Sequence, residues 1–311
     1  MEKLGRKIRI GLIVFLGLCS LAVNGGVFYI LADYHSDHYR ELAEVHMTQQ
    51  HQNCSQRLSV LGEQIRLFGE DEVLVEEIAD GKWREAEERI AAFIQSSGGI
   101  ESFQIYTLSG DRKEWEIRTC GRGDAGRITP ALLEQYQERA AQAGSDTVWF
   151  LREGTVEGEE YLSYLIPAAK ENKNTAFFLA NVPVDSYMDS LASANSNLWE
   201  EHPAIISESA AWYSEGFDVE KFSDIESYHE GVTRTAGDEM IYVRELTGMG
   251  EKFVQVISLK TGSLLLPTGL GFLAIFLVSL VFIYFGSRFI SRTITVPLNE
   301  MQEKMKNTLN Q

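Results

Sequence analysis

Two long stretches without a charged residue constrain this chain more than any other feature of its sequence. Residues 10–32 and residues 261–287 contain no Asp, Glu, Lys or Arg. A helix of about 20 apolar residues crosses the hydrocarbon core of a bilayer, so each stretch is long enough to span a membrane. We therefore expect two transmembrane helices, which excludes a single soluble globule.

The charges that flank these stretches predict their orientation. Residues 1–9 carry four basic side chains, and Arg288 and Arg292 follow the second stretch. Basic residues remain on the cytoplasmic side, so we expect both termini in the cytoplasm and residues 33–262 outside. A cleaved signal peptide is the alternative for the first stretch. No convincing small-x-small cleavage site precedes Asp33, which favours an uncleaved anchor.

The region between the two stretches is strongly acidic. Of the 45 acidic and 28 basic side chains in the sequence, 42 and 20 lie in residues 33–262, so this region carries 20 − 42 = −22. Such a charge favours solubility outside the cell and excludes a nucleic-acid binder with a basic face. Together with the apolar content, the charge pattern also excludes a disordered acidic chain.

Residues 34–68 predict one long helix that leaves the first span. They contain no Pro and a single glycine, Gly62. Side chains that suit a helix seam recur at alternating spacings of four and three, which is an a/d pattern over three heptads. The seam consists of Met47, His51, Cys54, Leu58, Leu61, Ile65 and Phe68. It packs either on its own domain or on a second copy of the chain.

After a second helical stretch at residues 81–95, the apolar period changes to two, as in strands. A first module is expected to have strands near residues 103–107, 115–120, 147–152, 161–166 and 176–182, with a helix over residues 129–143. A smaller module follows, with strands at residues 204–206, 210–213, 240–246 and 253–258. The expected segments are an N-terminal tail (1–9), a first span (10–32), a helical lead-in (33–98), a membrane-distal module (99–194), a membrane-proximal module (195–260), a second span (261–287) and a cytoplasmic helix (288–311).

Three segments resemble parts of known receptors. Residues 100–111 read IESFQIYTLSGD, residues 177–187 read FFLANVPVDSY, and the helix after the second span contains Ile294, Val296, Pro297, Leu298, Met301 and Met305. The first two resemble the opening strand and the last strand of a double Cache sensor. The third resembles the first helix of a HAMP linker. This order resembles the sensor region of bacterial receptors and sensor histidine kinases.

The resemblance implies an α+β fold, with a long N-terminal helix and two PAS-like antiparallel sheet modules. It also implies a homodimer that passes a signal through Ile294, Pro297, Leu298, Met301 and Met305. Kinase activity is implied only for a longer parent protein, because the sequence ends within the first HAMP helix. The chain is then the input half of a receptor, as a truncated gene or a fragment.

Candidate ligand-binding residues come from the strands of the distal module. A ligand pocket needs a few convergent polar groups in an aromatic wall. The candidates are Tyr106, Arg118, Trp149, Arg152, Tyr161 and Tyr164. Strand alternation prevents all six from facing one cavity. The amino-acid-binding motif of double Cache sensors is not present at its usual spacing, so the ligand stays an unknown small molecule.

The remaining chemistry-bearing residues support no catalytic site. The sequence has no HExxH, GxSxG or P-loop motif and no cysteine–histidine spacing of a zinc site, so no cofactor or metal is expected. Cys54 and Cys120 either pair in a disulfide or stay separate thiols. Asp185 either holds a ligand amine or caps the following helix.

We expect a bacterial two-span sensor that transduces the binding of an extracytoplasmic ligand. The alternatives are a membrane-anchored interaction protein without signalling output, and the input half of a chemoreceptor or a cyclase. The HAMP-like seam favours a signalling protein, because an inert anchor has no need for one.

Overall fold

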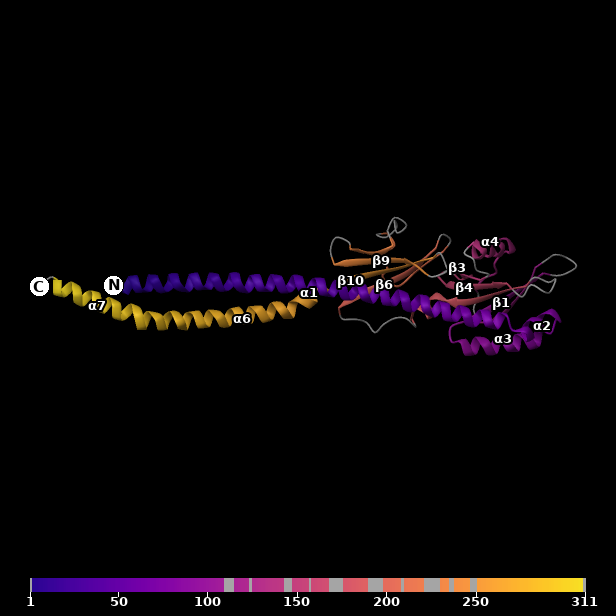
Figure 1. Ribbon diagram of the computed structural model, residues 1–311, viewed down its shortest axis with the longest axis horizontal. Coiled ribbons are helices and arrows are strands. Elements are labelled where there is room, and N and C mark those ends of the chain that lie inside the picture. Colours follow the sequence, from indigo (N-terminus) through magenta and orange to yellow (C-terminus); the bar gives the residue numbers. More distant parts are fainter. Residues whose placement is uncertain are drawn as a thin grey trace. The chain divides into compact units, whose positions relative to one another are not determined.

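The computed structural model divides the chain into two compact units, Met1–Glu41 with Lys260–Gln311, and Leu42–Leu259 (Figure 1). It describes residues 2–108, 115–122, 125–142, 147–156, 158–167, 176–189, 198–207, 210–220, 230–234, 238–246 and 251–309. Helix α1 (Glu2–Gly69) belongs to both units, because it continues without a break from the first apolar stretch into the acidic region.

The first unit contains two helices that are long and apolar enough to cross a membrane. They are the N-terminal part of α1 and helix α6 (Thr261–Ile290). The two helices touch where the Phe28 ring packs edge-on against Phe272, with centroids 5.5 Å apart. A π-helical turn, Ser291–Thr295, then joins α6 to α7 (Val296–Leu309).

Three helices open the second unit. After α1 ends at Gly69, α2 (Glu72–Ala79) and α3 (Trp83–Ser97) follow in close succession. Asp71 caps α2, because its carboxylate accepts a hydrogen bond from the Val73 backbone N–H at 3.0 Å. Gly98 ends α3 with a φ of 66°, a left-handed conformation that favours glycine.

The distal module is a five-stranded antiparallel sheet with the strand order β2-β1-β5-β4-β3. Its strands are β1 (Ser102–Leu108), β2 (Trp115–Gly121), β3 (Val148–Glu153), β4 (Glu160–Pro167) and β5 (Ala176–Pro183). Helix α4 (Pro130–Gln142) precedes β3, and α5 (Val184–Asp189) follows β5. All five strands overlap the predicted ones.

The proximal module repeats this topology in the order β7-β6-β10-β9-β8. Its strands are β6 (Trp199–Ile206), β7 (Ala211–Tyr213), β8 (Gly231–Arg234), β9 (Glu239–Glu245) and β10 (Lys252–Leu259). The prediction of four strands is wrong, because β8 is too short to show an apolar period. Strand β6 also begins earlier than predicted. It tolerates Pro203 because the pairing with β7 ends at Ala204, and beyond it the Pro203 carbonyl accepts from the Ser214 N–H at 3.0 Å, a bond that needs no N–H from proline.

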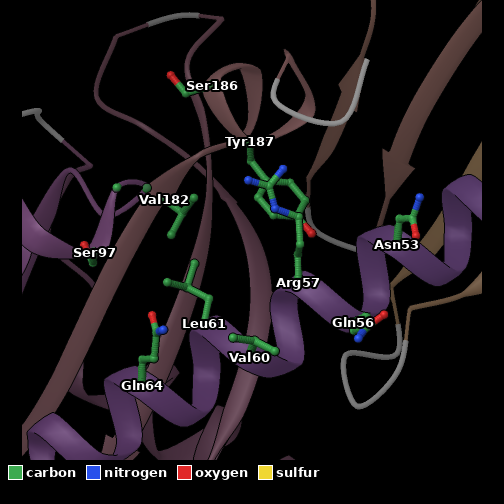
Figure 2. Close-up of a pocket in the computed structure, with 12 residues that line it drawn as sticks. Asn53, Gln56, Arg57, Val60, Leu61, Gln64, Ser97, Val182, Ser186 and Tyr187 are labelled. Atoms are coloured by element: carbon green, nitrogen blue, oxygen red, sulfur yellow. The ribbon is translucent and has the colours of Figure 1, made fainter. Parts of the chain in front are cut away.

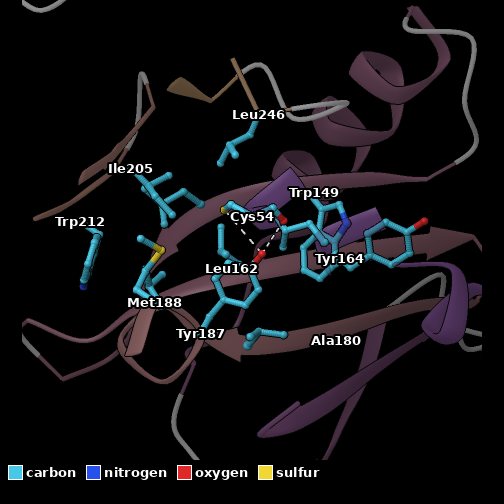
Figure 3. Close-up of a cluster of buried hydrophobic side chains, with 14 of the residues drawn as sticks. Cys54, Trp149, Leu162, Tyr164, Ala180, Tyr187, Met188, Ile205, Trp212 and Leu246 are labelled. Carbon is cyan, nitrogen blue, oxygen red and sulfur yellow. Dashed lines mark hydrogen bonds between the residues drawn. The ribbon is translucent and has the colours of Figure 1, made fainter. Parts of the chain in front are cut away.

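The predicted seam of α1 packs on its own domain. Met47, Cys54, Leu58 and Ile65 are at most 2% exposed and belong to one hydrophobic cluster with side chains of both sheets. Figure 3 shows part of this cluster around Cys54. The alternative, in which these side chains meet a second copy of the chain, is wrong, because the two sheets already cover them.

Helix α4 packs on the other face of the distal sheet (Figure 1). The ring of Tyr136 stacks on Phe150 of β3 with centroids 3.7 Å apart, and Leu133 is fully buried beside them. The distal sheet is therefore covered on both faces, by α1 with α3 and by α4. The predicted α+β class, with a long helix and two antiparallel sheets, is confirmed.

Candidate functional site

A buried polar cluster lies on the face of the distal sheet that α4 covers. Ser102 and Gln104 belong to β1, Ser163 to β4 and Asn181 to β5, and the strand register brings them onto one face. Each of these four residues is at most 2% exposed. Buried polar groups need hydrogen-bond partners, and Arg152 of β3 supplies several of them.

Arg152 is the charged centre of this cluster. Its Nε donates to Ser163 Oγ at 2.8 Å, while its two Nη atoms donate to Asn181 Oδ1 at 2.7 Å and to the Gly126 carbonyl at 3.0 Å. All three acceptors are neutral, and no carboxylate of a described residue forms an ion pair with Arg152. Burial lowers the pKa of the Arg152 guanidinium to about 10, since loss of water disfavours the charged form.

Two amides and three hydroxyls are joined by further hydrogen bonds in the cluster. Ser163 Oγ donates to Asn181 Oδ1 at 2.8 Å, and Asn181 Nδ2 donates to Ser102 Oγ at 3.1 Å. The Tyr106 hydroxyl donates to Gln104 Oε1 at 2.9 Å. Burial raises the pKa of Tyr106, so its hydroxyl keeps its proton and serves as a donor.

The loop before α4 closes over the cluster at Gly126. Its carbonyl oxygen accepts hydrogen bonds from Arg152 and from Gln104 Nε2, the latter at 2.7 Å. Gly126 has a φ of 71°, and a Cβ there would lie 3.2 Å from Thr155 Cγ2, so both conformation and space favour glycine. The Ile128 N–H donates to the Tyr106 hydroxyl at 3.0 Å. Arg152, Gln104 and Tyr106 thus hold this loop on the sheet.

The six predicted ligand-binding residues divide between the two faces of the distal sheet. Tyr106, Arg152 and Tyr161 lie on the α4 face, whereas Arg118, Trp149 and Tyr164 lie on the α1 face. Tyr161 is at the rim of the first group, where its hydroxyl donates to Glu159 at 3.3 Å. Arg152 and Tyr106 are therefore the predicted residues that share one cluster.

Arg118, Trp149 and Tyr164 make contacts that support the fold on the α1 face. The Arg118 guanidinium lies 4.2 Å from the centroid of the Trp83 ring, a cation–π contact. The rings of Trp149 and Tyr164 lie 4.7 Å apart and both approach Gly62 of α1. Since the sheet separates them from Arg152, these three residues do not belong to the polar cluster.

Four members of the cluster were not among the predicted site residues. Ser102, Gln104, Ser163 and Asn181 each interrupt an apolar strand with one polar side chain. That interruption is the available sequence signal, since a buried strand position rarely holds an uncompensated polar group. The sequence does not predict which of these polar side chains come together, because this depends on the order of the strands in the sheet.

The disulfide alternative for Cys54 and Cys120 is wrong, since both are free and buried thiols. Cys54 of α1 faces α5, where the Tyr187 hydroxyl donates to its carbonyl at 2.6 Å (Figure 3). Cys120 lies on the edge strand β2, and β1 separates β2 from β5. Burial raises the pKa of each thiol to about 11, which keeps both neutral.

A groove of about 580 Å³ lies elsewhere on the second unit, along α1. It is lined by residues of α1, the end of α3, β5 and α5, and none of the predicted site residues lines it. Figure 2 shows Arg57 of α1 reaching toward Tyr187. Val182 also lines this groove, and it lies on the sheet face opposite Asn181, so the groove is separate from the Arg152 cluster.

Known proteins match this chain in structure. No protein-family model matches the sequence, and no curated protein matches it. A domain of a sensory box/GGDEF family protein from Vibrio parahaemolyticus has a TM-score of 0.52 at 10% identity, over 72% of this chain and 97% of that one. The extracellular domain of vpHK1S-Z8, assigned as a histidine kinase, has a TM-score of 0.48 at 11% identity, over 71% and 96%.

A third solved structure is the ligand-binding domain of the Campylobacter jejuni chemoreceptor Tlp3 in complex with L-valine. It has a TM-score of 0.44 at 9% identity, over 73% of this chain and 96% of that chain. The likeness to the Vibrio parahaemolyticus domain, which extends over almost all of that domain, is the one that shows a shared fold. The chain thus has the fold of a sensory domain with two antiparallel modules, as its resemblance to double Cache sensors implied.

Proposed function

We propose that this chain is the extracytoplasmic ligand sensor and transmembrane signal transducer of a bacterial receptor. The observation that carries the proposal is Arg152, a half-buried guanidinium on the distal sheet whose hydrogen-bond acceptors among the described residues are all neutral. In the proposed topology both termini are cytoplasmic and the acidic region lies outside. The receptor class is a sensor histidine kinase or a related protein, and the chain acts as a homodimer.

The buried charge favours an anionic ligand. Removing a guanidinium from water is costly unless a charged partner compensates the charge. A planar carboxylate can accept two parallel hydrogen bonds from the N–H groups of a guanidinium. A carboxylate or a similar anion in place of the Gly126 carbonyl would provide that partner. Tyr106 and Gln104 would supply neutral donors beside it. The proposed ligand is therefore a small organic acid or another small anion.

Ligand binding would change the loop before α4. The Gly126 carbonyl holds the loop through Arg152 and Gln104, so an anion at Arg152 competes with the loop for the same donors. The protein then has a loop-bound state and a ligand-bound state, and the ligand shifts the population according to its differential affinity. This competition is the proposed first step of signalling.

The signal would continue through β5 into the proximal module. Asn181 of the cluster lies four residues before Asp185, whose carboxylate accepts a hydrogen bond from Trp212 Nε1 at 2.6 Å. Trp212 belongs to β7, which pairs with β6, and β6 pairs with β10 just before α6 begins. Helix α7, the HAMP-like segment, is the proposed output end.

Thermal unfolding of the 311-residue chain in lipid nanodiscs tests this function. The probes are succinate, citrate, inorganic phosphate, free amino acids and neutral sugars. A ligand at 100 times its dissociation constant adds ~2.7 kcal/mol of stability, which raises the melting temperature by several degrees. We expect a saturable shift with an anionic probe and none with the sugars.

Two arginine variants locate the effect. Arg152→Gln should abolish the shift, whereas Arg118→Gln, on the opposite face of the same sheet, should retain it. A shift that survives in a folded Arg152→Gln variant would place the ligand elsewhere. The absence of any shift across the probes would favour the membrane-anchored interaction protein instead.

A further inference from the structure

A second cluster of titratable groups lies between α1 and the proximal sheet. His46 Nε2 of α1 is 2.8 Å from Glu201 Oε1 of β6, and each side chain is about one-fifth exposed, at 23% and 21%. Trp199 Nε1 donates to the same carboxylate oxygen at 2.6 Å, and its ring lies 5.3 Å from the His46 ring. This cluster shares no residue with the Arg152 cluster.

Two amides complete the contacts around Glu201. Gln50 Nε2 donates to Glu201 Oε2 at 3.1 Å, and Gln255 Nε2 of β10 donates to Gln50 Oε1 at 3.1 Å. Gln50 Nε2 is also 3.1 Å from His46 Nε2. A 2.8 Å contact with a carboxylate requires the proton on His46 Nε2, so this nitrogen cannot accept from Gln50. His46, Gln50 and Trp199 therefore all donate to Glu201.

Glu201 is held in its ionised form. Burial acts to raise the pKa of its carboxyl, but hydrogen bonds from His46, Trp199 and Gln50 lower the pKa overall. Among these donors within the described part of the chain, His46 is the one that can acquire a positive charge. A half-buried anion with neutral donors thus faces a histidine.

His51, five residues further along α1, contacts a neutral carbonyl where His46 contacts a carboxylate. Its Nε2 lies 3.0 Å from the Glu245 carbonyl, and its buried Nδ1 has no hydrogen-bond partner in the described structure. Burial lowers the pKa of His51, Arg244 lowers it further, and Glu230 opposes them. Burial therefore favours the neutral form of His51.

We propose that His46 and Glu201 form a proton-binding site that gives the chain a second input, the acidity outside the membrane. Protonation of His46 turns its hydrogen bond to Glu201 into an ion pair. Histidine is the side chain that ordinarily changes its charge between about pH 5 and pH 8. The site is independent of Arg152, and it rests on the proposed function only for its place outside the membrane.

The position of this pair suits a role in signalling. α1 brings the chain from the first apolar stretch to His46, and Glu201 pairs with Ile257 on β10, four residues before α6 begins. The pair therefore connects α1, through which the chain enters the second unit, with β6, which pairs with the last strand before α6. Acidification would strengthen the contact between α1 and β6, and a rise in pH would weaken it.

Nuclear magnetic resonance of the 311-residue chain in nanodiscs, with its six histidines isotopically labelled, tests the proposal. His202, the next residue on β6, is the internal reference, because its ring contacts the neutral carbonyl of Glu215. We expect the His46 midpoint to depend on Glu201, its 2.8 Å partner. Glu201→Gln should lower the His46 midpoint by about one pH unit, because an opposite charge is lost. Glu200→Gln, an exposed neighbour on the same strand, should leave it unchanged.

Hydrogen exchange measures how protonation changes the local stability of α1 where it contacts β6. After correction for intrinsic rates, exchange of residues 42–51 should slow as the pH falls from 8 to 5.5 in a chain that carries His51→Gln, because protonation of His51 acts in the opposite direction. His46→Gln should abolish this pH dependence, and His202→Gln should retain it. The proposal is overturned if exchange of residues 42–51 does not slow with falling pH while His46 is present, a measurement that needs no Glu201 variant. It is also overturned if a folded Glu201→Gln leaves the His46 midpoint in place.

Discussion

Single residues in the second unit show two ways of accommodating a half-buried charge. Arg152 is surrounded by neutral acceptors, and burial lowers its pKa to about 10. Glu201 is surrounded by donors, and their hydrogen bonds outweigh the effect of burial. A buried charge with neutral partners favours a charged ligand, and a charge beside a histidine favours a proton. The two clusters therefore suit different inputs.

Gly62 is a residue whose small size is required by its neighbours. A Cβ at this position would lie 3.0 Å from Trp149 Nε1 and 3.2 Å from the Tyr164 ring. We expect Gly62→Ala to destabilise the second unit by about 1–3 kcal/mol through overpacking, although alanine favours a helix by about 1 kcal/mol. Urea denaturation of the full chain measures the change. Gln64→Ala, on the exposed side of α1, is the control, and an equal effect of both would contradict the explanation.

The titration of His51 predicts a loss of stability in acid. Burial lowers its pKa in the folded chain, so its contribution is present above the unfolded pKa of about 6.5 and is lost as the pH falls below that value. Between pH 7.5 and 5.5 we expect the free energy of unfolding to fall, by at most about 1.4 kcal/mol per pH unit. His51→Gln should reduce this slope. Both chains should carry His46→Gln, so that the proposed His46–Glu201 site does not contribute to the slope. Equal slopes in the two chains would refute the prediction.

At the scale of elements, α5 and β7 provide a direct link between the two modules. Asp185 lies in the first turn of α5, and its carboxylate accepts from the Trp212 indole at 2.6 Å. This contact gives Asp185 a role that neither of the two sequence interpretations included. Trp212 itself is 7% exposed and belongs to the hydrophobic cluster under α1.

Removing this link should separate the responses of the two modules. Trp212→Phe keeps an aromatic ring but loses the donor, so we expect a loss of about 1 kcal/mol, the value of one hydrogen bond. Ligand-induced changes in hydrogen exchange should then stop at β5 and no longer reach β6 and β7. Tyr213→Phe, on the next position of β7, is the matched control. Transmission that persists in Trp212→Phe would show that another path carries the signal.

At the scale of the whole molecule, α7 and the π-helical turn before it expose the side chains of the predicted seam. Ile294, Leu298, Met301 and Met305 are between 53% and 65% exposed, so this chain alone leaves them uncovered. A parallel helix bundle with a second copy would cover them. We expect Met301→Cys to form disulfide-linked dimers in membranes under mild oxidation and Glu300→Cys to form far fewer. Equal cross-linking at both positions would refute the seam, and substituting Leu298 by Lys should weaken the Met301 cross-link.

Local pattern was enough to predict most elements of this fold. The two apolar stretches, the α1 seam and nine of the ten strands show an apolar run or period in the sequence, and β8 does not. The site residues were harder to predict. Trp149 and Arg152 are three residues apart on one strand, and alternation places them on opposite faces. Aromatic and basic character alone therefore could not distinguish a core residue from a cluster residue.

The sequence by itself determined the two apolar helices, the acidic region between them and the face of α1 that is buried. These properties depend on composition and on periods within one segment, because water and lipid act on each segment locally. The tertiary structure decided which polar groups meet. Arg152, Ser163 and Asn181 come from three strands, and His46 and Glu201 are separated by 155 positions, 201 − 46. Strand order and helix packing bring such residues together, and these depend on contacts between distant segments.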